Sequence, residues 1–291
     1  MLPDARKLFD EIPQPTSTSF NALLSAQIKA KKPHFVPQLF VDLPAKHESI
    51  VPDSVSYGIL IKSFCLSGKT QKAFEAFSEL KEKGMEPSLI VYTTLVDSYY
   101  KMGKREEAEK LWDEMVGKGI KPDLAAYNVK AMYPAKNGSP EEVVEVMREM
   151  EAAEMKPDAI THNYLITCYC RNGRFEEAKE AYEEFRKKRI DPNAGIFKML
   201  VQFLCENGDF DGGLMVCRDS MKCNKIPDFK TTSALVEGLV KGGKVEEAKE
   251  VIGVVKERFP DNLLGGWRML EKKLGLSVDG QVSEQPQVEA A

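Results

Sequence analysis

The sequence contains no run of eighteen apolar residues and no cysteine pair in C-x-x-C spacing. The first absence excludes a helix that spans a membrane, and the second argues against a zinc site with closely spaced thiolate ligands. No G-x-x-x-x-G-K-[ST] phosphate loop is present, and the three histidines, His34, His47 and His162, are scattered. We therefore expect no catalysis, no metal, no cofactor, no small-molecule substrate and no membrane partner.

Neither sign of charge is in large excess, since the net charge is −4 and the pI is near 5.7. Taken over the whole chain, this balance argues against a strongly basic surface, but it hides how charge is divided between faces. The six cysteines form no disulfide framework, which suits an intracellular or organellar protein. Three of them, Cys65, Cys170 and Cys205, differ by multiples of 35 residues and are predicted to fill one buried slot of a repeat.

A repeat of 35 residues is visible in the prolines and glycines. Six prolines follow one another at steps of 35, namely Pro52, Pro87, Pro122, Pro157, Pro192 and Pro227. Six glycines keep the same step, namely Gly68, Gly103, Gly138, Gly173, Gly208 and Gly243. Such internal self-similarity is typical of solenoids, in which each unit buries its apolar face against its neighbours.

Each unit has the apolar spacing of two helices. In residues 89–123 one stripe precedes Gly103 and a second follows it, and their members are Tyr92, Leu95, Val96 and Tyr99, then Ala108, Leu111, Trp112 and Met115. Gly119 and Pro122 end the second stripe. Each unit is therefore predicted to be a helix, a tight turn and a second helix.

This hairpin opens on an aromatic residue followed by Asn or Thr, has a central Gly and "EEA", and ends on Pro-Asp. In these features residues 17 to about 261 resemble the pentatricopeptide repeat. The W-x-x-L-G-x-x-Y signature of the tetratricopeptide repeat is absent, as are the H-x-E and P-C-x-x-C motifs of a zinc deaminase. The resemblance implies the plain P-type subclass and an all-α, right-handed superhelical solenoid of about seven helix-turn-helix repeats.

The predicted organisation begins with a second-helix remnant of a truncated repeat at 1–16. Seven repeats follow, at 17–53, 54–88, 89–123, 124–158, 159–193, 194–228 and 229–261. A capping helix at 262–276, in which Trp267 covers the last apolar face, precedes a disordered polar tail at 277–291. Pro134 is expected to kink or shorten its helix, and Gly213, where neighbouring units have alanine, is expected to loosen packing.

The resemblance implies that each repeat addresses one base of single-stranded RNA. The fifth and last residues of a unit would face the base edge, and the candidates are Asn21, Asp53, Thr93, Asp123, Asn128, Asp158, Asn163 and Asn193. The second residue would pack on the face of the base, and the candidates are Val55, Ile90, Ala125 and Ile160. The family's code then reads U, unknown, G, U, C, unknown, unknown. Gly58 and Lys198 are not code residues, and the partner of Ser233 in the shortened last unit is uncertain.

A structural role for these polar residues stands beside the RNA role. Asp after Pro at a helix start is an ordinary N-cap, and Asn caps or terminates helices as well. The two roles are compatible, because one side chain can start a helix and still present atoms to a ligand.

The second helices are rich in acids, whereas the ends of the first helices carry a recurring cation. This slot holds Lys29, Lys101, Lys136, Arg171 and Lys241, interrupted by Leu66 and Glu206. A row of cations suits contact with a phosphate backbone. Compensation of the helix dipole explains the same residues equally well.

The resemblance implies a non-catalytic RNA-binding protein of organellar gene expression. The sharpest hypothesis is an RNA-bound subunit of the plant mitochondrial ribosome, with ribosomal RNA and neighbouring ribosomal proteins as partners. A free, sequence-specific factor for transcript stabilisation, processing or translation is the first alternative, and a protein–protein scaffold is the second. A mitochondrial location is expected, with the chloroplast as the alternative.

Overall fold

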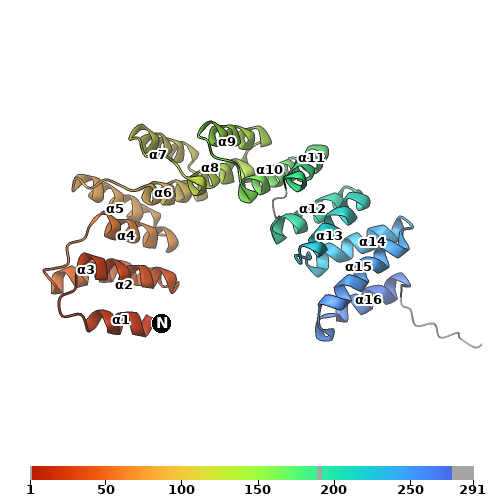
Figure 1. Cartoon of the computed structure of the whole chain (residues 1–291), viewed down its shortest axis with the longest axis horizontal. Coiled ribbons are helices and arrows are strands. Elements are labelled where there is room, and N and C mark those ends of the chain that lie inside the picture. The colour runs from red at the N-terminus through yellow and green to blue at the C-terminus, as the bar shows by residue number, and fades with distance from the viewer. Residues whose placement is uncertain (1, 189–191, 277–291) are drawn as a thin grey trace, which may run out of the picture. The chain divides into compact units, whose positions relative to one another are not determined.

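The computed structural model describes residues 2–188 and 192–276. Over these residues the chain forms sixteen α-helices and two short 3₁₀-helices, and it contains no strand (Figure 1). The predicted all-α fold is confirmed. The tail predicted at 277–291 lies outside the described residues.

The helices divide into two compact units. The N-terminal unit comprises Met1–Asn137 and Glu145–Lys156, and the C-terminal unit comprises Gly138–Val144 and Pro157–Ala291. The boundary therefore crosses helix α9, whose first turn belongs to the C-terminal unit and whose remainder belongs to the N-terminal unit.

The N-terminal unit contains the first eight helices and most of α9. Their bounds are α1 Leu2–Asp10, α2 Ser17–Lys29, η1 Pro33–Phe35, α3 Val36–Lys46, α4 Ser54–Leu66, α5 Thr70–Glu82, α6 Leu89–Lys101, α7 Arg105–Gly117, α8 Leu124–Asn137 and α9 Pro140–Ala152. From α4 to α7 each helix has thirteen residues, as the repeat predicts.

The C-terminal unit contains the remaining helices. Their bounds are α10 Ala159–Arg171, α11 Phe175–Lys187, α12 Ala194–Glu206, α13 Phe210–Lys222, α14 Phe229–Lys241, α15 Val245–Arg258, η2 Asp261–Leu263 and α16 Gly265–Leu274. The pairing of a first and a second helix thus continues to α15. The exact limits of the repeats stay predictions.

The apolar stripes are the surfaces on which the hairpins close. In α6 the side chains of Tyr92, Leu95 and Val96 are buried, and in α7 so are Leu111 and Trp112. The turn between these helices needs a left-handed residue, and Gly103 supplies it with a φ of 73°. Burial of each stripe against its partner supplies the hydrophobic driving force that an isolated short helix lacks.

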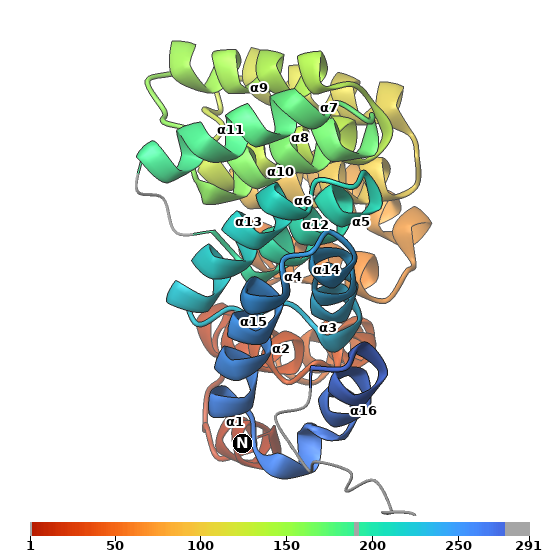
Figure 2. The ribbon, with the colours of Figure 1, turned by 90° about the vertical axis from the view of Figure 1, so that its right-hand side faces the viewer.

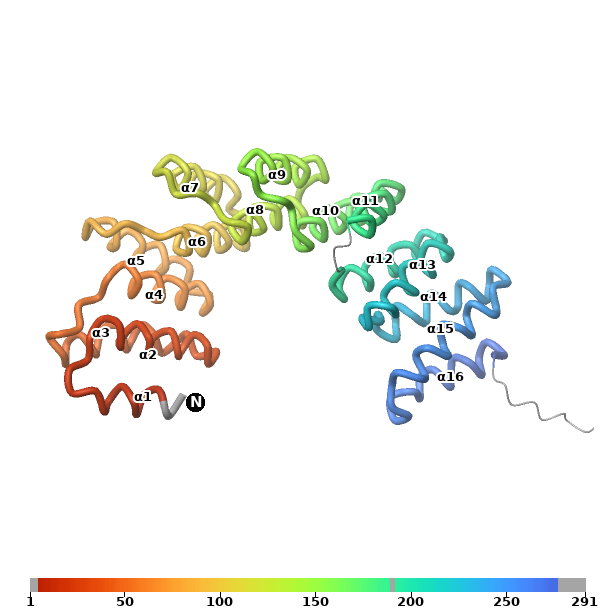
Figure 3. The backbone as a smooth tube through the Cα atoms, viewed as in Figure 1, coloured from red at the N-terminus to blue at the C-terminus, as the bar shows by residue number. Residues whose placement is uncertain are grey.

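First helices of successive repeats lie side by side and run in the same direction. In the N-terminal unit α2 packs on α4, α4 on α6 and α6 on α8 (Figure 3). At one end, the Ser17 hydroxyl donates to the Val51 carbonyl at 2.6 Å, which holds the start of α2 near the start of α4. At the other end the Tyr100 and Tyr133 rings stack with centroids 4.9 Å apart. Like ends of the first helices are therefore neighbours.

The acids of the second helices hold the first helices in place. The buried Tyr57 donates its hydroxyl to Glu79 at 2.6 Å, and one repeat later Tyr92 donates to Glu114 at 2.9 Å. In the next repeat Lys130 is the partner of the acid in place of a tyrosine, and its ammonium lies 2.6 Å from the Glu149 carboxylate. Some of the acidic residues of the second helices thus stabilise the packing of first helices on second helices.

Two expectations about irregular residues are wrong, namely that Pro134 shortens its helix and that Gly213 loosens packing, whereas a kink at Pro134 stays a prediction. Helix α8 is not shortened by Pro134, since it continues to Asn137 and has fourteen residues. The proline lies in the last turn, where its missing N–H removes a single hydrogen bond. Gly213 does not loosen its helix either, because a Cβ there would lie only 3.1 Å from Leu235 Cδ1. The absence of a side chain lets α13 approach α14 closely.

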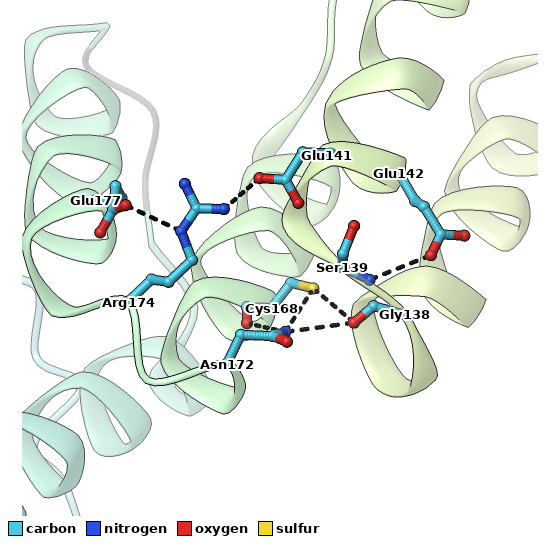
Figure 4. Close-up of polar contacts among 8 residues, drawn as sticks. All are labelled: Gly138, Ser139, Glu141, Glu142, Cys168, Asn172, Arg174 and Glu177. Atoms are coloured by element: carbon cyan, nitrogen blue, oxygen red, sulfur yellow. Dashed lines mark hydrogen bonds and ion pairs between the residues drawn. The ribbon is translucent and has the colours of Figure 1, made fainter.

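The first turn of α9 is joined to α10 and α11 by polar contacts (Figure 4). The Asn172 amide donates to the Gly138 carbonyl at 3.3 Å, and the Cys168 thiol makes a weak contact with the same oxygen at 3.7 Å. Arg174 binds Glu141 and, at 2.9 Å, Glu177. These contacts explain why residues 138–144 belong to the C-terminal unit.

Helix α16 packs on α14 at the C-terminal end of the described chain (Figure 2). Trp267 is buried and meets the Phe229 ring edge-on at 5.0 Å between centroids. Gly266 allows this contact, because a Cβ at that position would lie 3.0 Å from the same ring. The helix covers apolar surface that would otherwise face water.

Substitution by alanine is expected to have opposite effects on stability at two helical glycines of the C-terminal unit. In Gly238→Ala the added methyl would lie 1.9 Å from Phe210, so we expect a loss of about 1–3 kcal/mol from overpacking. In Gly253→Ala the methyl meets nothing within 4 Å, so we expect a gain of about 0.5–1 kcal/mol from reduced backbone entropy. Denaturant unfolding of both variants measures the difference, and a change of the same sign in both would contradict the packing described.

Candidate nucleic-acid interface

The last residues of the repeats are helix caps in this structure. Asp53, Asp123, Asp158, Asn193 and Asp228 each accept a hydrogen bond through Oδ1 from a backbone amide two or three residues later. Ser88 is an exception, since it precedes α6 without a side-chain bond. Capping occupies one side-chain oxygen and leaves the second atom of each carboxylate or amide outside the capping bond. The capping and base-reading roles are therefore geometrically compatible.

The first predicted pair is in direct contact. The Asn21 amide donates to Asp53 Oδ1 at 3.0 Å, and Ser56 donates its hydroxyl to the Asn21 carbonyl oxygen at 2.6 Å. Partial burial raises the pKa of Asp53, but hydrogen bonds from Ser56 and Asn21 outweigh it and hold the pKa below its usual value. The group at this position is thus an ionised acceptor with a fixed orientation.

The predicted pair of Thr93 and Asp123 lines a cavity together with Ile90 and Ala125, which are predicted to stack on bases. The cavity measures about 300 Å³ and lies on α4, α6 and the start of α8. Its lining combines aliphatic, polar and cationic side chains, among them Ile90, Ala125, Thr93, Asp123, Lys62 and Lys101. Ile90 is 67% exposed, so its aliphatic surface is available at the cavity.

Two fifth residues hold buried polar atoms without partners. Thr93 Oγ1 is buried and makes no hydrogen bond with the described residues, and both amide atoms of Asn163 share this property. An unpaired buried polar group costs stability, so such groups are expected where a ligand supplies the missing bond. Asn128 is also buried and lies in the N-terminal unit, whereas its predicted partner Asp158 caps α10 in the C-terminal unit.

The predicted stacking residues keep their exposure in both units. Val55 is exposed in α4, Ala125 in α8 and Ile160 in α10. Each is the second residue of its helix and follows the capping residue by two positions. Aliphatic surface and a polar acceptor are thus adjacent at the start of every one of these first helices.

In the repeat whose fifth residue is Lys198, the fifth and last residues form an ion pair with each other. Lys198 Nζ lies 2.5 Å from Asp228 Oδ2, the oxygen that the cap leaves unused. This interaction, together with the Thr231 amide, lowers the pKa of Asp228 to about 2. The adjoining cavity on α12 and α14, about 340 Å³, has Lys230 where the N-terminal unit has Ile90. This repeat lacks both the readable pair and the aliphatic surface.

The cations at the ends of the first helices are exposed. Lys29, Lys136, Arg171 and Lys241 have no carboxylate partner among the described residues. Lys101 differs, because its ammonium contacts Asp97 at 2.5 Å. Lys62 is a second cation of the N-terminal cavity. The repeat pattern does not predict it, because the equivalent positions of the later repeats are Asp97, Met132, Thr167, Gln202 and Glu237.

Other kinds of site find no support in the part of the chain that is described. Residues 2–188 and 192–276 contain no group of three or more His, Cys, Asp or Glu side chains placed to hold a metal ion. Over the same ranges no helix combines the length and apolar character required to cross a membrane.

The fold and the cavities define a helical-repeat protein in which several first helices present an aliphatic residue beside polar ones. Two sequence models match it, the "PPR repeat family" over residues 52–98, 87–129 and 157–206, and the "PPR repeat" over 135–154 and 230–258. The chain belongs to the pentatricopeptide repeat (PPR) family.

Two relatives from Arabidopsis thaliana match most of the chain. A mitochondrial pentatricopeptide repeat-containing protein is 45% identical over 287 residues, which cover 97% of this chain and 68% of the relative. The small ribosomal subunit protein mL103 is 43% identical over 280 residues, which cover 95% of this chain and 68% of the relative.

Among solved structures, the maize pentatricopeptide repeat protein PPR10 is similar in fold. It aligns with a TM-score of 0.61 at 21% identity, over 90% of this chain and 40% of PPR10. The structure of PPR10 in complex with an 18-nt psaJ RNA element aligns with a TM-score of 0.58.

The ion pair of Lys198 predicts the titration of Asp228. A lowered pKa means that the pair stabilises the fold above the ordinary aspartate range and that this contribution is lost as the pH falls through about 2. In Lys198→Gln the pKa of Asp228 should rise towards the usual value of about 3.9. NMR titration of the Asp228 carboxyl carbon measures this, with Lys241→Gln as the control that leaves it unchanged. An unaltered pKa in Lys198→Gln would refute the pairing.

Proposed function

We propose that the protein binds RNA without catalysis and acts in mitochondrial gene expression, as an RNA-bound subunit of the plant mitochondrial ribosome. The observation that carries RNA binding is the cavity on α4, α6 and α8. There, Ile90 and Ala125 offer aliphatic faces while Thr93 and Asp123 offer polar atoms. This combination suits an unpaired base, which has an apolar face and a hydrogen-bonding edge.

The two polar groups of this cavity suit different tasks. Asp123 Oδ1 is held by the Ala126 amide at 2.8 Å, so Oδ2 is the atom presented to a ligand. A carboxylate oxygen accepts hydrogen bonds only, and guanine, which the family's code assigns to Thr with Asp, has N–H donors on its Watson–Crick edge. Thr93 Oγ1, which lacks a protein partner, completes the recognition.

Only some repeats offer such a pair, and this favours a fixed subunit over a free factor. Gly58 has no side chain, and Lys198 neutralises Asp228. RNA that stays in one assembly needs contacts to shape and phosphates more than a long base sequence. The relatives support this assignment, because one is named as mitochondrial and others are named as small ribosomal subunit proteins.

The substitution Asp123→Asn tests base reading without removing the helix cap. The cap needs an oxygen, so the amide nitrogen would take the outward place of Oδ2, as Asn193 shows by capping through Oδ1. A donor would then face the donors of guanine, and binding to a strand with guanine at this position should weaken by about 1–3 kcal/mol. Fluorescence anisotropy with matched strands that differ only at that base measures the effect.

Asp113→Asn is the matched control, because it makes the same chemical change at an exposed position on α7, outside the cavity. It should leave the affinity for every strand unchanged. If Asp123→Asn weakens binding to all four bases equally, the cavity does not read the base.

Sedimentation of a mitochondrial lysate tests the assembly. A tagged protein should move with a ribosomal subunit in a sucrose gradient and stay there at moderate salt. Recovery only in light fractions would favour the free transcript factor. Association with the subunit that survives Lys29→Glu and Lys136→Glu and treatment with ribonuclease would favour a protein scaffold instead.

A further inference from the structure

The hairpin turns of the N-terminal unit carry a concentration of lysines. Between the end of each first helix and the start of its partner lie seven exposed lysines, which we call the turn edge: Lys29, Lys31, Lys32, Lys69, Lys101, Lys104 and Lys136. Because α2, α4, α6 and α8 pack side by side in the same direction, their C-terminal ends lie along one edge of the unit.

The turn edge has almost no compensating negative charge. Residues 27–32, 65–70, 100–105 and 135–137, which form the four turns, contain no Asp and no Glu. Among the described residues a carboxylate contacts only one of the seven lysines, namely Lys101 through Asp97. Clustered like charges without partners repel one another, so a cluster of this kind is expected where an anionic partner binds.

Helix stability does not explain the whole set. Lys29 and Lys101 are the last residues of α2 and α6, where a cation is favourable to the helix dipole. Lys69 and Lys104 are the N-cap residues of α5 and α7, and neither makes a side-chain capping bond. At an N-terminus the dipole disfavours a cation, and lysine satisfies no orphan amide. These two lysines therefore cost stability in the protein alone.

In the C-terminal unit Arg171 and Lys241 are also exposed and without a carboxylate partner among the described residues, but the cations at the N-caps of the second helices are paired. Arg174 is bound to Glu141 and Glu177 (Figure 4), and Lys244 is paired with Asp211. The turn between α12 and α13 carries Glu206 and Asp209 in place of cations. In the described part of the chain, unpaired cations at the N-caps of the second helices, as at Lys69 and Lys104, are thus a feature of the N-terminal unit.

We propose that the turn edge of the N-terminal unit binds the phosphate backbone of a base-paired RNA segment. This inference rests on the proposed function and adds a second RNA surface to the groove. Lysine ammonium groups contact phosphates but do not read bases. In the three turns after α4, α6 and α8 the only aromatic ring is that of Tyr100, which is buried and stacked on Tyr133. The turn after α2 differs, since His34 and Phe35 are exposed there. Most of the edge therefore lacks aromatic surface for unpaired bases. Paired RNA presents phosphates and shape, which is what this surface fits.

A triple variant of the full chain, Lys32→Gln with Lys69→Gln and Lys104→Gln, tests the edge. None of these side chains lines the cavity or belongs to the cations at the ends of the first helices. The probes are an RNA duplex of about 16 base pairs and arbitrary sequence, and a single strand with guanine at the Thr93 position. Duplex affinity should fall at least tenfold, and the slope of log K against log salt should become shallower by about 0.9 for each lysine.

The control is a second triple variant with the same change of charge, Lys7→Gln with Lys110→Gln and Lys121→Gln. These exposed lysines lie outside the turn edge. The inference is supported if only the turn-edge variant loses duplex binding while both variants keep the helical circular dichroism spectrum and are no less stable to heat than the wild type. It is overturned if the two variants lose duplex affinity equally, because net charge alone would then be responsible.

The outcome also separates this inference from the proposed function. If the wild-type protein binds the single strand but not the duplex, the inference is wrong and the proposed function stands. If it binds neither RNA, both are wrong. If an acidic peptide such as polyglutamate competes with the duplex as well as a second duplex does, the edge is a general anion surface and the inference is overturned.

Discussion

The hydrogen bond between a capping side chain and the first turn of the next helix is the constraint on which the interface depends. In Asp53, Asp123 and Asp228 the cap uses Oδ1. It satisfies an orphan amide, begins the helix and fixes the direction of the second oxygen. Each capping residue stands two positions before the second residue of its helix. Where that second residue is aliphatic, a polar acceptor and an aliphatic face therefore occur together. One local interaction therefore serves both the fold and the proposed recognition.

The same capped position has different chemistry in different repeats. Asp53 is bound by the Asn21 amide, Asp123 faces a cavity beside Thr93, and Asp228 is neutralised by Lys198. In the first two arrangements Oδ2 lies outside the capping bond, whereas in the third Oδ2 is paired within the protein. A uniform scaffold thus carries repeats that are open to a ligand and one that is closed. The N-cap cations of the second helices follow a similar division, since Lys69 and Lys104 have no carboxylate partner among the described residues and Arg174 and Lys244 are paired.

Periodicity made much of this structure predictable. The 35-residue step of the prolines and glycines predicts the hairpins, and the stripe around Tyr92 and Leu95 predicts which faces are buried. Periodicity failed where a single contact decides the outcome. Gly213 looks like a defect in the repeat, but Leu235 fills the space beside it. Pro134 looks like a break, but it lies close enough to the end of α8 for the helix to continue.

By itself, the sequence determined the all-helical repeat, the family and the capping residues, because these depend on local spacing. Only the tertiary structure decided which of those residues meet. Asn21 and Asp53 are 32 residues apart and share a hydrogen bond, and Lys198 and Asp228 form an ion pair across 30 residues. It also brought Lys62 to the cavity and aligned Lys69 with Lys104 along one edge. Side-by-side packing of helices creates these neighbours, and no pattern within one helix specifies the contacts between two.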